Sequence, residues 1–328
     1  MPPTVLLLTH SADHFTIDRV AAALARRGAR PVRLDTDRFP RRVGLSVSHG
    51  PEGLVYELSP DGGGERLSGG EVAAVWTRKF WAPDLGDELD PAFRDACRRQ
   101  AHEALQGFLD GLAGARWIDP PARLRAGDDK LRQMRLAAAA GLAQPRTLVS
   151  NEPERVRRFY DEVGGRMVAK VLAALSTSMD RSGPFVPTSE VSADDLEDLD
   201  SLRYAPMIFQ ERVEKAYELR VMFVAGRTYC GAIDAGASAA GGTDWRQAAP
   251  DEVSWRRGEL PPDVAARLAR LMAALGLAQG ACDFIVTPAG EHVFLEVNPL
   301  GEWGMLERDL DLPISEALAA ALLGEPPP

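Results

Sequence analysis

Two carboxylates near the C-terminus are spaced so that they could share one metal ion. Asp283 and Glu296 lie in two short runs of β-branched and aromatic residues, and the Pro-Ala-Gly-Glu segment between these runs predicts a β-hairpin. If Thr287 faces His292 across the turn, Asp283 faces Glu296, and Asn298 shares their side of the sheet. Opposed carboxylates repel each other, and a divalent cation between them would offset the repulsion. Three such oxygen donors suit Mg²⁺; a solvated sheet face carrying unrelated acids is an equal alternative from this stretch alone.

The composition is that of an ordinary globular chain. Its 328 residues are 45% hydrophobic and 26% charged, which suggests two or three domains with ample core. A net charge of −10 argues against nucleic acid or an anionic membrane as the main partner. No apolar run approaches the ~18 residues of a membrane span, and the N-terminus lacks the basic segment of a signal peptide. Cys97, Cys230 and Cys282 match no metal or disulfide spacing, so we expect a cytoplasmic protein.

The first third of the chain predicts an α/β domain. Residues 4–8 and 32–34 are strand-like, and the helical apolar stripe of residues 15–27 between them implies that the two strands pair in parallel. The turn after the first strand contains no glycine, so this domain is not expected to bind nucleotide phosphates. A later strand ends in the aromatic and basic run 76–81, which either lines a cleft or is a plain strand end.

Two lysines stand out in the middle of the chain. Lys130 lies near the start of a helix predicted over residues 128–141, and Lys170 is embedded in the apolar strand 166–172. A lysine in such a strand either reaches water from a sheet edge or is directed at an anion. The hydroxyl-rich stretch 175–182 suits a flap over phosphates or any surface loop.

The last part of the chain predicts further strands and a mobile loop. Residues 218–224 and 228–233 read as adjacent strands, and Glu218 and Arg220 share one face of the first. This spacing suits either a functional pair or a simple exposed ion pair. The stretch 235–242, rich in Gly and Ala, predicts a mobile loop.

These elements, in this order, resemble the ATP-grasp superfamily. The match covers residues 127–323 and comprises Lys130, Lys170, the segment QERVEKAYELR, an aspartate and the segment FLEVNP. The resemblance implies an α/β fold of the α+β ATP-grasp type, in which an N-terminal parallel-sheet domain precedes two α+β subdomains that sandwich ATP. We accordingly divide the chain into residues 1–121, 122–205 and 206–328.

Within the superfamily, the segments WTRKFW, EKAYELRV and NPLGEW resemble the maturases of graspetides, which close side-chain lactones or lactams in a ribosomal precursor peptide. Leu300 and Glu302 depart from the pattern N-P-N-G-Q-W that is common there. The resemblance implies an enzyme that activates Asp or Glu side chains with ATP and joins them to Thr or Ser as ω-esters, or to Lys as ω-amides. The alternatives are a ligase that adds an amino acid to a peptide or protein terminus, as in glutamate-ligase relatives, and a non-catalytic ATP- or peptide-binding module.

The resemblance also implies roles for individual residues. Lys130 and Lys170 would hold the α- and β-phosphates of ATP. Arg220 would act with Lys170 as a catalytic residue, because a guanidinium can stabilise the transferring phosphoryl group with two hydrogen bonds. The Mg²⁺ ligands that it implies are Asp283, Glu296 and Asn298.

A short hinge segment would bind the nucleoside part of ATP. Backbone groups of Glu211 and Val213 would bind adenine, and Glu218 would take the ribose hydroxyls. The full set of implied nucleoside contacts is Gln210, Glu211, Arg212, Val213 and Glu218.

Several features of the implied site are left open by the sequence. The side chains of Arg212 and Lys215 are expected to be solvated, so Arg212 would act only through its backbone. No Ser, His or Cys is placed as a nucleophile beside a base, and no general base is identifiable. The stretch 235–242 is a candidate cover for the leader segment of the precursor. A homodimer is the default expectation for such an enzyme.

Overall fold

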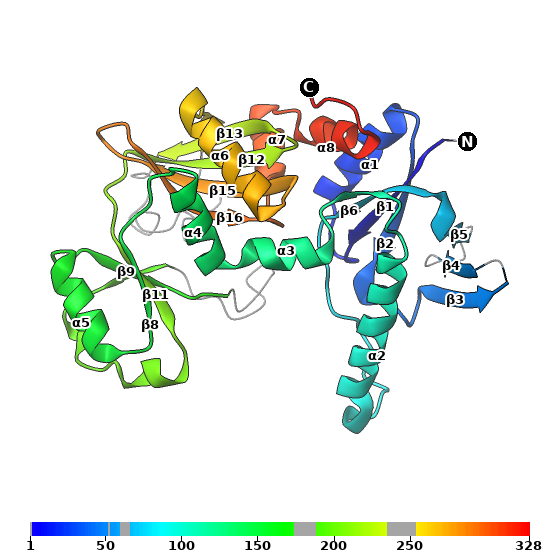
Figure 1. The fold of residues 1–328 in the computed structure, drawn as a ribbon, viewed down its shortest axis with the longest axis horizontal. Coiled ribbons are helices and arrows are strands. Elements are labelled where there is room, and N and C mark those ends of the chain that lie inside the picture. Colours follow the sequence, from blue (N-terminus) through cyan, green and yellow to red (C-terminus); the bar gives the residue numbers. More distant parts are fainter. Residues whose placement is uncertain (1, 52, 60–65, 174–187, 235–253) are drawn as a thin grey trace.

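The computed structural model describes residues 2–51, 53–59, 66–173, 188–234 and 254–328. The stretches 175–182 and 235–242, for which we expect a phosphate flap and a mobile loop, lie outside the described residues. Figure 1 shows an N-terminal sheet on the right, a C-terminal sheet at the upper left and a smaller sheet at the lower left. Within the described ranges, no helix combines the length and apolarity needed to cross a membrane.

The N-terminal unit is built on a parallel sheet. Its elements are β1 (Thr4–Thr9), α1 (Thr16–Arg26), β2 (Arg30–Asp35), β3 (Gly44–Gly50), β4 (Gly53–Ser59), β5 (Leu67–Ser68), β6 (Val72–Thr77), α2 (Pro91–Asp110) and β7 (Arg116–Ile118). The parallel sheet has the order β2-β1-β6-β7, and β3, β4 and β5 form a separate antiparallel sheet. β1 is buried along its whole length and pairs in parallel with both β2 and β6, which confirms the expected arrangement.

A small antiparallel sheet follows the N-terminal unit. The elements are α3 (Pro121–Asp128), α4 (Lys130–Ala139), β8 (Thr147–Ser150), α5 (Pro153–Glu162), β9 (Met167–Lys170), β10 (Ser189–Val191) and β11 (Met207–Glu211). The sheet has the order β10-β9-β11-β8. Its compact core contains Val156 and Phe159 of α5 packed with Met167 and Phe209 of the sheet.

The helix predicted over residues 128–141 forms, but it begins at Lys130 rather than at Asp128. Two helices, α3 and α4, meet at Asp129, whose ψ angle of 108° is extended. The Asp129 carboxylate accepts a hydrogen bond from the backbone N–H of Arg132 at 3.0 Å, which caps α4. The chain therefore turns immediately before Lys130 and places this lysine at the first position of α4.

The C-terminal unit holds the largest sheet. Its elements are β12 (Tyr217–Val224), β13 (Arg227–Asp234), β14 (Arg256–Arg257), α6 (Pro262–Leu275), β15 (Gln279–Val286), β16 (His292–Asn298), α7 (Gly304–Leu310) and α8 (Ile314–Leu323), in the sheet order β14-β13-β12-β15-β16. One face packs on α6 through a cluster that includes Leu268, Phe284 and Phe294. Met222 and Ala281, on the same sheet, join a second cluster with α8 and the N-terminal sheet. The N- and C-terminal units therefore share a hydrophobic core, and α8 lies beside α1 in Figure 1.

The predicted hairpin forms, but its register differs from the expected one. Val286, rather than Thr287, pairs with His292, and a bulge between Asp283 and Phe284 restores the pairing of Asp283 with Glu296. The bulge lets the Phe294 ring pack on Phe284, with ring centroids 5.5 Å apart, while Glu296 stays on the opposite face. Without this extra residue, alternation would put the buried ring and the carboxylate on the same side.

The small sheet extends past residue 205. β11 pairs with both β8 and β9, so the strand that we assign to the third domain belongs to the second sheet. We propose that the boundary between the second and third units follows Glu211.

Candidate active site

Three charged residues form one row across adjacent strands. Arg220 of β12 pairs with Asp283 of β15, and Asp283 pairs with Glu296 of β16. Asn298 lies two residues beyond Glu296 and pairs with Ala281, so it shares their face of the sheet. The structure thus brings together the residues that the sequence assigns to the metal and to the phosphoryl group.

Arg220 and Asp283 form a buried ion pair. Nη1 of Arg220 donates to both carboxylate oxygens of Asp283, at 2.8 and 2.9 Å, and the two side chains are 5% and 9% exposed. Nε and Nη2 of Arg220 donate to the backbone carbonyl of Glu302 at 3.2 and 3.0 Å. Gly301 permits this approach, because an added Cβ would lie 2.7 Å from Nη2 of Arg220. The guanidinium is therefore fixed at the row from two directions.

Lys130 holds the second carboxylate of the row. Its ammonium lies 2.9 Å from Glu296 and 3.2 Å from Asp128, and it donates to the backbone carbonyl of Val297 at 3.4 Å. Burial alone would lower the pKa of Lys130, but the charges of Glu296 and Asp128 outweigh it and raise the pKa above its ordinary value. A protein cation thus offsets each carboxylate, so the repulsion that we read from the sequence needs no metal to relieve it.

The oxygen donors nevertheless fit a magnesium ion. Asp283, Glu296 and Asn298 present two carboxylates and an amide from one sheet face, and carboxylate with amide oxygen is a donor set that Mg²⁺ accepts. Oδ1 of Asn298 also accepts a hydrogen bond from the backbone N–H of Leu300 at 3.2 Å, which orients the amide. No group of three or more His, Cys, Asp or Glu suited to a metal occurs in the described part of the chain, so the amide has to supply the third donor.

The residues assigned to the nucleotide lie mainly on the small sheet. Lys170 ends β9 and pairs with Ile208 of β11. Gln210 is buried, and its Nε2 donates to Oγ1 of Thr147 at 3.0 Å. The N–H of Glu211 donates to the carbonyl of Arg146 at 2.9 Å, so the backbone group of Glu211 that would face adenine is its carbonyl. Lys170 and these hinge residues thus stand on a different sheet from the row.

The hinge segment joins the two sheets. The Arg212 N–H donates to the carbonyl of Arg166 at 2.8 Å, and Val213 follows directly after it. The Arg212 side chain is 48% exposed and pairs with Glu190, in agreement with the expectation of a solvated side chain. The same expectation for Lys215 is wrong: it is 10% exposed and lies 2.6 Å from Glu218. Lys215 precedes Glu218 by three residues, and the Glu218 carboxylate that it contacts is itself 14% exposed.

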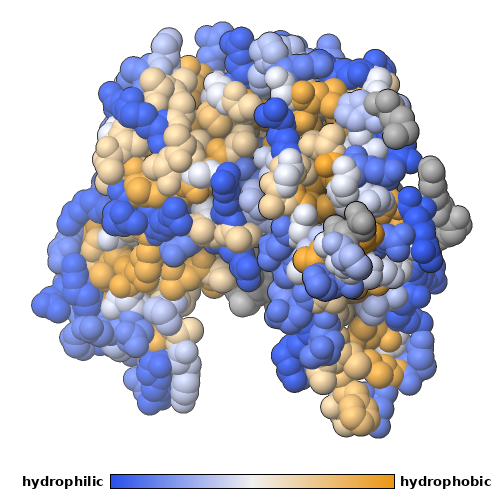
Figure 2. Space-filling model, turned by 45° about the vertical axis from the view of Figure 1, so that its right-hand side comes forward, coloured by the Kyte–Doolittle hydropathy of each residue, from blue (hydrophilic) through white to orange (hydrophobic). Residues whose placement is uncertain are grey.

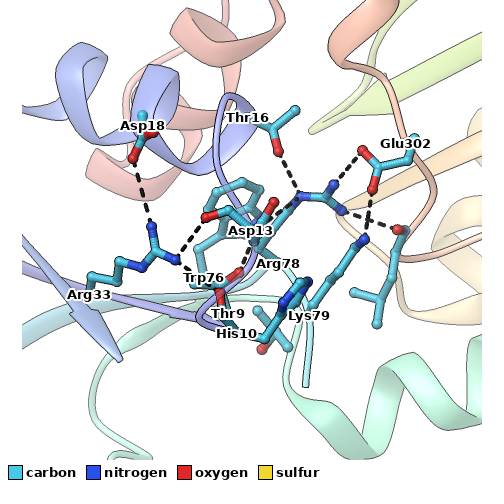
Figure 3. A network of polar contacts seen from close by, with 12 residues as sticks. Thr9, His10, Asp13, Thr16, Asp18, Arg33, Trp76, Arg78, Lys79 and Glu302 are labelled. Carbon is cyan, nitrogen blue, oxygen red and sulfur yellow. Dashed lines mark hydrogen bonds and ion pairs between the residues drawn. The ribbon is translucent and has the colours of Figure 1, made fainter. Parts of the chain in front are cut away.

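The sequence analysis missed a polar network between the N-terminal sheet and the C-terminal loop. Figure 3 shows Arg78 and Lys79 directed at the carboxylate of Glu302. Nη2 of Arg78 lies 2.5 Å from this carboxylate, and Nζ of Lys79 lies 2.8 Å from it. Arg78 also donates to Oγ1 of Thr16 and to the backbone carbonyl of Leu300. The sequence analysis noted the basic residues of the run 76–81 and the departure of Glu302 from the family pattern. Nothing in the sequence indicated that these residues contact each other.

The two cations change the acidity of Glu302. Burial would raise the pKa of its carboxyl, but the charges of Arg78 and Lys79 and their hydrogen bonds lower the pKa to about 2. The rest of the aromatic run lies elsewhere: Phe80 and Trp81 line a cavity of about 330 Å³ beside α2. The end of the run therefore lines a cleft, while Trp76 is buried in the core and the basic residues contact Glu302.

Comparisons with known proteins address the fold and the family of the chain. A family model described as the MvdD pre-ATP grasp domain matches residues 4–125. The macrocyclase MdnB from Microcystis aeruginosa MRC is 48% identical, with 98% of this chain and 99% of that chain covered and a TM-score of 0.84. A search of curated proteins finds no match.

Two further solved structures contain ligands. A RiPP-associated ATP-grasp ligase from Chryseobacterium gregarium, in complex with ADP and a leader and core peptide, is 31% identical, with 99% and 97% of the two chains covered and a TM-score of 0.90. The ATP-grasp ligase PsnB, complexed with minimal precursor, Mg and ADP, is 25% identical, with 98% and 96% covered and a TM-score of 0.75.

The fold and these similarities define the protein as an ATP-grasp ligase of the peptide-ligase class. The chain belongs to the family of ATP-grasp macrocyclases that mature ribosomal peptides, because it is similar over nearly its whole length to the macrocyclase MdnB.

Proposed function

We propose that this enzyme activates Asp or Glu side chains of a ribosomal precursor peptide with ATP and closes ω-ester links to Thr or Ser. Links to Lys as ω-amides are the close variant. The observation that carries the proposal is the row Arg220–Asp283–Glu296, which sets a buried guanidinium beside two carboxylates. The choice of substrates is supported by similar ligases whose solved structures contain ADP with a leader and core peptide, or with a minimal precursor.

The reaction consists of two displacements. A side-chain carboxylate oxygen takes the γ-phosphoryl group of ATP, which forms an acyl phosphate and releases ADP. The hydroxyl oxygen of Thr or Ser then bonds to the acyl carbon, the bond from that carbon to the phosphate oxygen breaks, and the hydroxyl proton is lost. Such chemistry depends on positioning and on charge stabilisation more than on covalent participation by the protein.

The cations at the row are suited to this task. Arg220 would stabilise charge on the transferring phosphoryl group, because its position is fixed by Asp283 and by the Glu302 carbonyl before any substrate binds. Lys130 and Lys170 would bind phosphate oxygens from α4 and β9. Asp283, Glu296 and Asn298 would hold Mg²⁺, which supplies neutralisation of phosphate charge when bound.

The nucleoside would lie between the small sheet and β12. The Glu211 carbonyl and the Val213 backbone would bind adenine, with Gln210 and Arg212 as the rest of the hinge. Glu218 would take the ribose hydroxyls, and Lys215 would fix its carboxylate.

A mass measurement tests the proposal. The enzyme is incubated with ATP, Mg²⁺ and the acidic peptide encoded next to its gene. We expect the peptide to lose one water mass for each ring. A gain of one amino-acid mass would instead identify a terminus ligase, and ATP-independent binding without any mass change would identify a non-catalytic module.

A further inference from the structure

Lysine is rare in this chain, and three of its four lysines have a role in the proposed function. The sequence has 38 basic residues, and only Lys79, Lys130, Lys170 and Lys215 among them are lysines. Arginine serves everywhere else, including the exposed helix faces. A lysine is a compact charge with three rotatable donors, whereas an arginine presents a rigid fork, so the two are not interchangeable where a contact must be exchanged. Lys79 is the one lysine that the proposed function leaves without a role.

Lys79 and its neighbour Arg78 differ in accessibility. Arg78 is 2% exposed and, besides Glu302, contacts Thr16, the Leu300 carbonyl and, at 3.7 Å, Asp13. The Lys79 side chain is 15% exposed, and the Glu302 side chain that it contacts is 24% exposed. Arg78 is therefore a buried residue that connects the N-terminal unit to the C-terminal loop. The Lys79–Glu302 contact, in contrast, is accessible to a competing anion.

This contact lies next to the reacting centre. The backbone carbonyl of Glu302 accepts hydrogen bonds from Arg220, while its carboxylate contacts Lys79 and Arg78. One residue thus joins the cation of the row to the cations of the N-terminal sheet. A carboxylate bound to Lys79 would lie within one residue's reach of Arg220.

We propose that Lys79 binds a side-chain carboxylate of the peptide substrate, and that Glu302 occupies Lys79 until such a carboxylate replaces it. The proposal rests on the proposed function, because it assumes an acidic peptide as substrate. Glu302 keeps its second partner, Arg78, after the exchange, so its charge is not left unpaired. Glu302 then acts as an internal competitor that sets how strongly an acidic peptide binds.

Steady-state kinetics with the precursor peptide tests the competition. We expect Glu302→Gln to lower KM for the peptide about three- to tenfold, the range of one partly exposed charge contact, because the amide still accepts from Arg78 but competes weakly for Lys79. Lys79→Met should raise KM about tenfold with little change in kcat, and Lys79→Arg should recover part of the loss. Arg66→Met, which removes a 69% exposed basic residue of the same domain, is the matched control and should leave KM unchanged.

The outcomes separate the two proposals. If the wild-type enzyme removes no water from the peptide, the proposed function fails. If it does so, and KM is unchanged in Lys79→Met or rises in Glu302→Gln while both variants unfold at the wild-type temperature, the role of Lys79 is overturned and the proposed function stands.

The scarcity of lysine allows a direct test without the precursor. Reductive methylation with ¹³C-formaldehyde keeps the positive charge and gives one side-chain signal for each of the four lysines, assigned with Lys→Arg variants. Triglutamate should shift the Lys79 signal, at lower concentration in Glu302→Gln than in the wild type, and triglutamine should not. An unmoved Lys79 signal, or identical titrations in the two proteins, would contradict the proposal.

Discussion

The small sheet and the C-terminal sheet hold their charged residues in different ways. The C-terminal sheet packs against hydrophobic clusters on both sides, and the Arg220–Asp283 pair is buried within it. The small sheet is supported by one cluster around α5, and its outer strand β10 is largely exposed. Figure 2 shows the two lower lobes of the molecule separated by a hollow, with the lobe of the small sheet on the left.

This difference suggests a division of labour. Charges buried in the C-terminal sheet contribute to folding in addition to their proposed part in the chemistry, because an ion pair that loses one partner leaves an uncompensated charge. The small sheet is covered by only one hydrophobic cluster. Replacement of its proposed nucleotide-binding residues should therefore change the stability of the fold little. The following predictions test this comparison.

The largest effect is expected at Asp283. Asp283→Asn removes the counter-charge of a 5% exposed arginine and one proposed metal ligand at once. We expect ring formation to fall about a thousandfold and the free energy of unfolding to fall by about 3 kcal/mol. Product mass analysis and denaturant unfolding measure the two losses.

Glu296→Gln is the matched control for that experiment. Its partner Lys130 is 18% exposed, so activity should fall comparably while stability falls less. Equal losses of stability in the two variants would contradict the idea that burial sets the structural role.

A smaller effect, on activity alone, is expected at Lys170. Lys170→Met on β9 should weaken ADP binding and reduce ring formation about a hundredfold, because the proposed phosphate contact would be lost. The free energy of unfolding should change by less than about 1 kcal/mol, since β9 belongs to the thinly covered sheet. Calorimetric ADP binding and thermal unfolding measure both, with Lys170→Arg as control; a stability loss as large as that of Asp283→Asn would break the comparison.

The two sheets also differ in how well the sequence predicts them. Strand alternation placed Asp283, Glu296 and Asn298 on one face correctly, because it is a local property. The pairing of Arg220 with Asp283 was not predicted, because it joins two strands that are distant in the sequence. The bulge between Asp283 and Phe284 was not predicted, because it depends on the packing of Phe294 on Phe284. The cations that pair with these carboxylates were also missed as partners, because such contacts depend on tertiary structure. Arg78 and Glu302 are 224 residues apart in the sequence and meet only when the first and last units pack together.

Glu302 is intermediate between the buried charges of the C-terminal sheet and the exposed residues of the small sheet, because it is partly exposed yet contacts two cations. Its pKa is lowered from 4.5 to about 2, so the folded state binds this proton less tightly than the unfolded state does. The stabilisation is therefore complete above about pH 4.5 and is lost as the pH falls toward 2. With allowance for its partial exposure, the loss is about 2 kcal/mol, which is smaller than the loss expected for Asp283→Asn. Denaturant unfolding of the wild type and Glu302→Gln at pH 5 and pH 2.5 measures it: the wild type should lose more stability than the variant, and parallel losses would show that Glu302 is as weakly coupled to folding as a residue of the small sheet.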